Sequence, residues 1–177
     1  MGGERQQAGV AAGGRDIVLA WGMAEPARSL SRAILAFVAL PGIVAFLVPL
    51  AVAIGWLHAP PRNAAGWLPV LVGVSLLLWC VREFHVAGRG TLAPWAPPRH
   101  IVTSGPYRFS RNPMYVAVAM ILFGWGQLFG SPGLLLYALA VVLAFHLRVV
   151  LSEERWLART FPEQWPAYRQ RVPRWLL

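Results

Sequence analysis

The 177-residue chain has no lysine and a single cysteine, and only 13% of its residues are charged. One cysteine, Cys80, excludes an internal disulfide framework and a zinc motif built from several cysteines. The low charge content, beside 57% apolar residues, excludes an ordinary water-soluble domain and indicates an integral membrane protein. The histidines lack the close spacing of a metal site, so packing or interfacial roles are favoured and no metal is expected; they are His58, His85, His100 and His146.

Long charge-free windows dominate the rest of the chain. They cover residues 33–61, 63–81 and 112–147, which are 29, 19 and 36 residues long. A membrane-spanning helix needs roughly 20 apolar residues, so the third window holds two short spans if it turns in the middle. Gly130-Ser131-Pro132-Gly133 supplies that turn, because proline stops a helix and glycine tolerates unusual backbone angles. The sequence therefore predicts an all-α protein with about four transmembrane helices, at residues 33–57, 64–81, 114–129 and 133–147.

The positive charge is distributed unevenly over this predicted topology. All sixteen basic residues are arginines, and the net charge is +9. Fifteen of them fall on the side that holds both chain termini, and only Arg62 falls on the other side. This asymmetry follows the positive-inside rule, so we predict a multi-pass protein with cytoplasmic N- and C-termini. The charge thus has a topological explanation, and nucleic acid is not expected as a partner.

The chain divides into two predicted regions. Residues 1–32 carry mixed charge and several glycines and are expected to form a cytoplasmic leader. They lack an apolar segment followed by a small-residue cleavage site, so no removable signal peptide is expected. Residues 33–177 form the transmembrane domain, whose motif-bearing part is 103–177.

Two segments outside the apolar windows have their own predictions. The proline-rich stretch 88–112 predicts an ordered loop with a turn or a short strand. The last helix is expected to continue beyond the membrane, with Leu151, Leu157 and Phe161 on the side that faces the bundle.

Two adjacent carboxylates, Glu153 and Glu154, follow the last apolar window. On a helix neither has a basic residue three or four positions away, so local ion pairs cannot neutralise them. They must face water, pair with arginines of another segment, or contact a cationic ligand.

A second polar motif precedes the predicted hairpin. Arg111 is followed by Asn112-Pro113, which predicts a helix start with Asn112 as the N-cap and Pro113 as the first helical residue. A helix N-terminus beside guanidinium groups can receive a carboxylate or a phosphate. Tyr107 and Tyr115 bring aromatic rings to the same interface. The hairpin can bring this motif and the two glutamates together at one membrane surface.

The ordered set of motifs resembles the isoprenylcysteine carboxyl methyltransferase family. The set comprises Gly-Pro-Tyr at 105–107, Arg-Asn-Pro-Met-Tyr at 111–115, the charge-free hairpin, Glu-Glu-Arg-Trp-Leu at 153–157, Phe161, and the segment 168–173. The resemblance covers about 75 residues, from Thr103 to the C-terminus. It implies S-adenosylmethionine as cofactor and a small lipophilic or lipid-linked acceptor that reaches the site from the bilayer.

The resemblance also implies roles for individual residues. The cofactor-binding residues carried over are Tyr107, Arg111, Asn112, Pro113, Tyr115 and Glu154. The residues implied at the reacting centre are Arg148, Glu153 and Glu154. Arginines there could hold an anionic acceptor, and a glutamate could contact the cofactor's ribose or amino group or take a proton from the acceptor.

This sequence departs from the family at two of these positions. The family commonly has histidine where this chain has Asn112, and glycine where it has Pro162. Asparagine can still form hydrogen bonds, but it is neither an acid nor a base near neutral pH. Any proton transfer therefore falls to another residue.

Two other functions fit parts of the same pattern. An NADPH-dependent membrane reductase of the sterol-reductase type has similar arginine and tyrosine segments, although the adjacent glutamates and small size favour a methyltransferase. A non-catalytic membrane protein could use the cytoplasmic arginines to bind anionic membrane lipids.

Overall fold

The computed structural model describes residues 38–57, 60–86 and 101–176. All regular structure in these ranges is helical, which confirms the predicted all-α class. The expected leader, the first five residues of the first predicted span, and most of the 88–112 loop lie outside the described residues.

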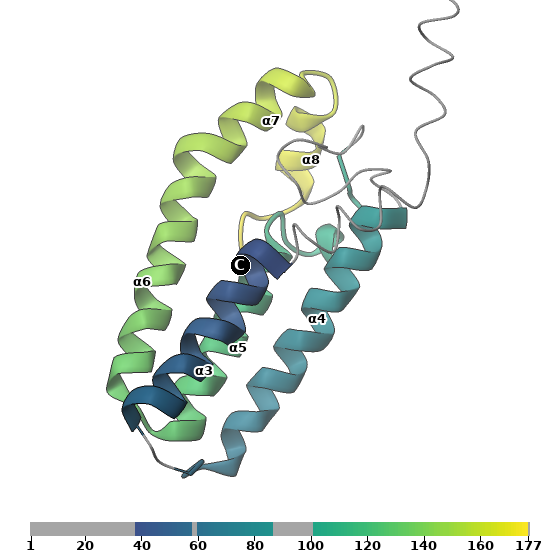
Figure 1. The fold of residues 1–177 in the computed structure, drawn as a ribbon. Coiled ribbons are helices and arrows are strands. Elements are labelled where there is room, and N and C mark those ends of the chain that lie inside the picture. Colours follow the sequence, from purple (N-terminus) through teal and green to yellow (C-terminus); the bar gives the residue numbers. More distant parts are fainter. Residues whose placement is uncertain (1–37, 58–59, 87–100, 177) are drawn as a thin grey trace, which may run out of the picture.

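Four long helical segments form the body of the molecule, and the short helix α8 lies at one end of it (Figure 1). In chain order the elements are η1 (Val38–Leu47), α3 (Val48–Val52), η2 (Ala53–Leu57), η3 (Ala64–Gly66), α4 (Trp67–Val86), η4 (Gly105–Arg108), α5 (Pro113–Phe129), α6 (Pro132–Arg148), η5 (Val149–Glu153), α7 (Glu154–Thr160) and α8 (Trp165–Arg171). The first three elements form one continuous helix, and α6, η5 and α7 form another.

Two of the helical segments are long and apolar enough to cross a membrane, Ala64–Glu83 and Pro132–Thr160. Two further apolar helices are shorter, Pro41–Gly55 and Pro113–Phe129. A helix of 17 residues is about 25 Å long, against roughly 30 Å for a bilayer core. All four predicted apolar helices therefore exist, whereas the four-span topology stays a prediction.

Small residues allow α4 and α5 to approach closely. A Cβ atom added to Gly73 of α4 would lie 2.8 Å from the carbonyl oxygen of Ala117. One added to Gly124 of α5 would lie 2.9 Å from the amide nitrogen of Val70. Within a membrane, helix association depends on van der Waals contact and on small residues that let backbones meet. These glycines therefore fix α5 directly against α4.

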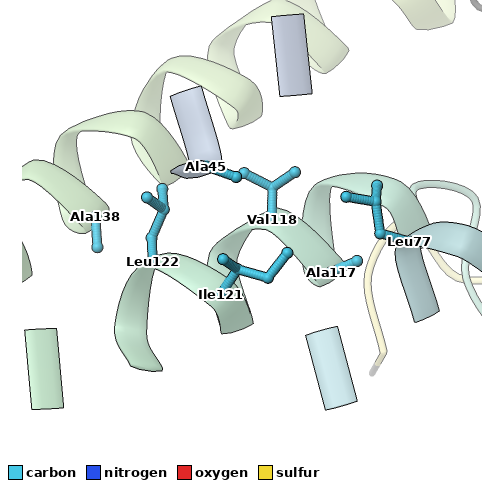
Figure 2. Close-up of a cluster of buried hydrophobic side chains, with 7 residues drawn as sticks. All are labelled: Ala45, Leu77, Ala117, Val118, Ile121, Leu122 and Ala138. Atoms are coloured by element: carbon cyan, nitrogen blue, oxygen red, sulfur yellow. The ribbon is translucent and has the colours of Figure 1, made fainter. Parts of the chain in front are cut away.

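Helix α5 is the central helix of the bundle, because it contacts α4, α6 and η1. Figure 2 shows its buried side chains meeting those of the three surrounding helices. The cluster consists of Ala45, Leu77, Ala117, Val118, Ile121, Leu122 and Ala138. Four of these seven residues belong to α5. The packing therefore holds α5 in place and fixes the position of the residues at its N-terminal end.

The predicted turn between α5 and α6 is confirmed. Gly130 ends α5 in the left-handed region, with φ of 58°, where an L side chain would be strained. Ser131 caps α6 by accepting a hydrogen bond from the amide of Leu134 at 3.4 Å, and Pro132 is its first residue. The turn folds the third apolar window back as a helical hairpin.

The arginines of the described residues gather at the end of the bundle opposite this turn. Arg62 is the only one at the turn end, where its amide donates to the carbonyl of Leu128 at 2.7 Å. The others are Arg82, Arg108, Arg111, Arg148, Arg155, Arg159, Arg169, Arg171 and Arg174. The motif-bearing end of the molecule is therefore its positively charged end.

The last long helix continues to Thr160, as predicted, but the predicted bundle-facing position of Leu151 is wrong. The Leu151 side chain is 54% exposed, whereas Phe161 is buried. Leu157 packs against a buried cluster of the C-terminal segment. Leu151 stands six positions before Leu157, about 120° away around a 3.6-residue helix, and the π-type turn η5 between them changes the repeat further.

Candidate active site

Glu154 is the centre of a buried ion network that joins the two polar motifs. Arg111, which precedes α5, donates from Nη1 to Glu154 Oε1 at 2.8 Å. Arg174, near the C-terminus, donates to the same carboxylate from Nε at 2.7 Å and from Nη2 at 2.9 Å. The side chains of Arg111 and Glu154 are only 10% and 14% exposed. Of the three predicted fates of this glutamate, pairing with arginines of other segments is therefore the one observed.

Glu153 forms a separate and more exposed pair. Arg148 donates from Nε to Glu153 Oε1 at 2.7 Å, and the Tyr115 hydroxyl donates to the same oxygen. The Arg148 and Glu153 side chains are 52% and 30% exposed, so solvent screens this pair more than the Glu154 network. The two residues are five positions apart, and the π-type turn η5 brings positions at that spacing onto one face.

Asn112 stands where the sequence predicted it, directly before α5, but the capping role predicted for its side chain is wrong. Its Nδ2 atom donates to the carbonyl of Arg174 at 3.0 Å, and the side chain makes no capping hydrogen bond. Pro113 is buried and is the first residue of α5, as predicted. The carbonyl of Arg174 takes up the amide because the C-terminal segment lies against the start of α5.

Tyr107 is buried in η4 and helps to hold the loop that precedes α5. Its carbonyl accepts a hydrogen bond from the Tyr168 hydroxyl at 2.8 Å, and its ring packs with Cys80 and Val102. Burial raises the pKa of both phenols, Tyr107 and Tyr168, above the ordinary value, so both remain neutral near pH 7. Tyr107 thus ties the loop both to α4 and to α8.

Sequence analysis missed Glu83 as a partner of this loop. The Ser104 hydroxyl donates to Glu83 Oε2 at 2.6 Å, and the carboxylate is 8% exposed. Its other oxygen accepts from Trp79 Nε1 at 3.3 Å and from Arg82 Nη1 at 3.0 Å. Gly105 has φ of 56°, and a Cβ atom there would lie 2.6 Å from Glu83 Cγ. The end of α4 therefore anchors the start of the loop. The first residue of the Gly-Pro-Tyr motif is glycine because a side chain there would strain the backbone and clash with Glu83.

Sequence analysis also missed the C-terminal segment as a wall of the site. The amide of Arg111 donates to the carbonyl of Pro173 at 2.9 Å. The Ser110 hydroxyl donates to the carbonyl of Arg174 at 3.3 Å, beside the bond from Asn112. Nothing near Arg174 in the sequence suggests an ion pair, since no acidic residue stands within ten positions of it. Its position directly after the segment 168–173 of the resemblance was the only signal.

The arginines of the network keep their charge in different surroundings. Burial lowers the pKa of Arg111, against the opposing effect of Glu154, whereas the hydrogen bond to Glu154 raises the pKa of Arg174. Because arginine titrates far above neutrality, both remain cations. Arg111 Cζ lies 5.4 Å from the centre of the Trp165 ring, and its Nε atom is buried with no hydrogen bond among the described residues. This N–H is a donor that an anionic ligand group could use.

An apolar groove of about 580 Å³ lies between α5 and α6 and reaches the polar network. Its walls include Met120 and Phe123 of α5 and Leu139 of α6. At one end Tyr115 stacks on Phe145, with ring centres 4.3 Å apart. Tyr115 belongs both to the groove and to the Glu153 pair, so an apolar molecule in the groove would meet the polar site at this residue.

The structure thus places the residues singled out in the sequence at one end of the bundle, in two separate networks and a supporting framework. Arg111 and Glu154 form one network, and Tyr115, Arg148 and Glu153 form the other. The remaining three contribute to the framework of the loop and of the start of α5; they are Tyr107, Asn112 and Pro113. Within the described ranges, no group of three or more histidine, cysteine or acidic residues could hold a metal ion.

Comparison with known proteins gives a family and two relatives. A model of the phospholipid methyltransferase family matches residues 61–164. A cobalt-zinc-cadmium resistance protein of Cupriavidus metallidurans is 34% identical over 110 residues, which cover 58% of this chain and 45% of the relative. A nickel-cobalt-cadmium resistance protein of Alcaligenes xylosoxydans is 33% identical over 111 residues, covering 61% and 46%. The chain spans somewhat less than half the length of these relatives, and no solved structure matches it.

The family match begins before α4 and ends directly before α8, so it takes in the loop motif, the hairpin and both glutamates. It confirms the predicted resemblance to membrane methyltransferases of the isoprenylcysteine carboxyl methyltransferase type. The apolar helices agree with a membrane protein. The chain belongs to the phospholipid methyltransferase family.

Proposed function

We propose that this protein transfers a methyl group from S-adenosylmethionine to a small lipophilic or lipid-linked acceptor at the cytoplasmic face of a membrane. The observation that carries the proposal is the junction at Tyr115, where an apolar groove meets the Glu153–Arg148 pair. A polar cofactor and an apolar acceptor need two such surfaces in contact. The family match supports the reaction type.

The chemistry of the site suits this cofactor, which carries a carboxylate, an ammonium group, a sulfonium and ribose hydroxyls. The buried Nε–H of Arg111 is a donor for a carboxylate. The second oxygen of Glu153 makes no hydrogen bond among the described residues, so it can accept one from the ammonium group or from ribose. Family members generally use S-adenosylmethionine, which agrees with this set of donors and acceptors.

We assign the residue roles as proposals on the same basis. When bound, the cofactor supplies an activated methyl group, and the protein's contribution is to align the acceptor with it and to exclude water. Arg111, Tyr115 and Glu154 would contact the cofactor directly. Tyr107, Asn112 and Pro113 would hold the loop and the start of α5 in place for it. Arg148 and Glu153, at the mouth of the groove, would face the reacting groups.

The acceptor's class follows from the groove. Its lining between α5 and α6 is apolar apart from the end near Tyr115, so it suits a hydrocarbon tail with a reactive head at that end. The flanking face of α6 is exposed and apolar, with Leu136 and Leu139 67% and 64% exposed, so the groove opens toward the membrane interior in the proposed topology.

The concentration of arginines at the motif-bearing end supports a cytoplasmic position for the site and for both chain termini. The family match favours methyl transfer over the NADPH-dependent reductase considered above. The names of the two relatives state resistance to metals and no reaction, so they do not identify an acceptor.

Calorimetric binding of S-adenosylmethionine and S-adenosylhomocysteine to detergent-purified protein tests the proposal. We expect micromolar affinity, a loss of at least about tenfold in a Glu153→Gln, Glu154→Gln double variant, and no such loss in Glu163→Gln, whose side chain is exposed between α7 and α8. Transfer of labelled methyl groups to total membrane lipids should follow. Absence of binding by folded wild-type protein, together with binding of NADPH, would overturn the proposal in favour of a reductase.

A further inference from the structure

His146 occupies a position in the groove that the sequence did not indicate. It lies near the charged end of α6, its side chain is half-buried, and it lines the groove. Its ring stacks on the Trp175 indole, with ring centres 6.1 Å apart and planes 27° apart. Its ring nitrogens make no hydrogen bond to another described residue.

Among the residues that line the groove, His146 is the only histidine, and no aspartate or glutamate lines it. Histidine is the side-chain type that ordinarily gains or loses a proton between about pH 5 and 8. Glu153 does not line the groove, and the oxygen that it turns to Tyr115 accepts hydrogen bonds from the Tyr115 hydroxyl and from Arg148. Asn112 carries no titratable group and is bound to the C-terminal segment. Among the residues that line the groove, His146 is therefore the one whose side chain has a nitrogen free to accept a proton.

Several titratable and charged groups stand on the elements around His146. They are Tyr115 on α5, Tyr137 on α6, Arg148, Glu153, Glu154, Arg155 and Arg159 further along the same continuous helix, and Arg174 next to Trp175 in the C-terminal segment. Arg148, Arg174 and the two glutamates are engaged in the ion pairs described above. None of these pairs involves the imidazole.

We propose that His146 is the general base of the methyl transfer and that the acceptor is a nucleophile that loses a proton: an amine, a thiol or a hydroxyl on a hydrocarbon tail, rather than a carboxylate. This inference rests on the proposed function. The acceptor atom forms a bond to the methyl carbon while the carbon–sulfur bond breaks and its electron pair stays on sulfur, leaving a neutral thioether. The acceptor's proton passes to an imidazole nitrogen and then to water. A carboxylate acceptor would need no such base.

The variant His146→Phe tests this role because it keeps a ring for Trp175 to stack on and removes both nitrogens. With dodecylamine, dodecanethiol or dodecanol as acceptor, we expect kcat to fall about 100-fold or more, the usual contribution of a general base. Affinity for S-adenosylmethionine, measured by calorimetry, should change less than about threefold, a few tenths of a kcal/mol.

Trp175→Leu tests whether His146 acts only through its packing, because this variant removes the ring on which His146 stacks and keeps the imidazole. We expect a smaller loss of kcat. In His146→Ala, free imidazole added to the assay should restore part of the rate, which a packing role would not produce. A His146→Phe protein with kcat within threefold of wild type would overturn the inference and leave the proposed function intact.

A readout independent of turnover is the NMR signal of ¹³C-labelled histidine in detergent micelles, with the His146 signal identified by its loss in His146→Phe. Dodecylamine should shift this signal more than dodecane of the same chain length. Equal shifts, or methylation of dodecanoate in preference to the three proton-bearing probes, would also overturn the inference. A folded wild-type protein that neither binds the cofactor nor transfers methyl groups would refute the proposed function, and this inference with it.

Discussion

Replacement of Arg174 by glutamine should destabilise the protein, although the sequence gives this arginine no partner. The variant removes two charge-assisted hydrogen bonds to Glu154, 2.7 and 2.9 Å long. It leaves the main chain of Arg174, and thus the bonds from Asn112 and Ser110, in place. The perturbation therefore isolates the guanidinium.

The expected size follows from the surroundings of the pair. A hydrogen bond to a charged group contributes roughly 1.5 to 3 kcal/mol, and removing one partner of a buried pair costs about 3 to 5 kcal/mol. Two features reduce the loss here: the Arg174 side chain is 31% exposed, and Arg111 stays bound to Glu154. We therefore expect the free energy of unfolding to fall by about 2 kcal/mol, which for a chain of this size lowers the midpoint of thermal unfolding by about 4 to 8 °C.

Tryptophan fluorescence during heating in detergent measures this midpoint, since the chain contains nine tryptophans. Arg171→Gln is the matched control, because its exposed side chain on α8 forms no ion pair with another described residue, and the change should stay within about 0.5 kcal/mol. A double-mutant cycle with Glu154→Gln should give a coupling of about 1 to 2 kcal/mol. Equal unfolding midpoints for Arg174→Gln and Arg171→Gln, or additive effects in the cycle, would refute the ion pair between Arg174 and Glu154.

Three further substitutions test the framework around the site with the same thermal assay. Gly105→Ala should lower the free energy of unfolding by about 1 to 2 kcal/mol, because the backbone there is left-handed and an added Cβ would meet the Glu83 side chain. Gly133→Ala is the control and should leave stability unchanged, because a Cβ atom there makes only ordinary contacts. Gly124→Ala should lower the free energy of unfolding by about 1 to 3 kcal/mol, because the added methyl group pushes α5 away from α4. Gly55→Ala is the control and should be tolerated, because a Cβ atom there meets nothing within 4 Å. Equal effects of the two substitutions would contradict the close approach of the helices. Tyr168→Phe should cost about 1 kcal/mol, because it leaves the buried carbonyl in η4 without its hydroxyl donor, and unchanged stability would count against that bond.

The sequence predicted the helical hairpin because its signals are local. A charge-free window, a proline that stops a helix and glycines that tolerate unusual backbone angles all act within a few residues. The same holds for the start of α5 at Pro113. The order of the motifs then indicated which residues would meet across the hairpin, and Arg111 and Glu154 do so.

The contacts that sequence reasoning missed are long-range or depend on the helical repeat. Arg174 reaches Glu154 only because α8 and the segment after it fold back against the start of α5, and no local pattern encodes that return. Glu83 meets Ser104 across 21 positions, part of which lie outside the described residues. The exposure of Leu151 was predicted wrongly because a spacing of six residues from Leu157 does not return to the same face of a helix, and η5 lies between the two.

The turn η5 also explains how two adjacent glutamates serve different surroundings. A wider turn over Val149–Glu153 aligns Arg148 with Glu153 on the side of Tyr115 and the groove, while Glu154 begins α7 and points to Arg111 and Arg174. Under the proposed function, Glu154, with its carboxylate held by two arginines, would chiefly hold the site together around the cofactor. Glu153, with one oxygen uncommitted among the described residues, is the glutamate placed to meet a ligand at the mouth of the groove. Loss of Glu154 should therefore weaken the fold and the cofactor site together, whereas loss of Glu153 should act on the ligands and leave the fold intact.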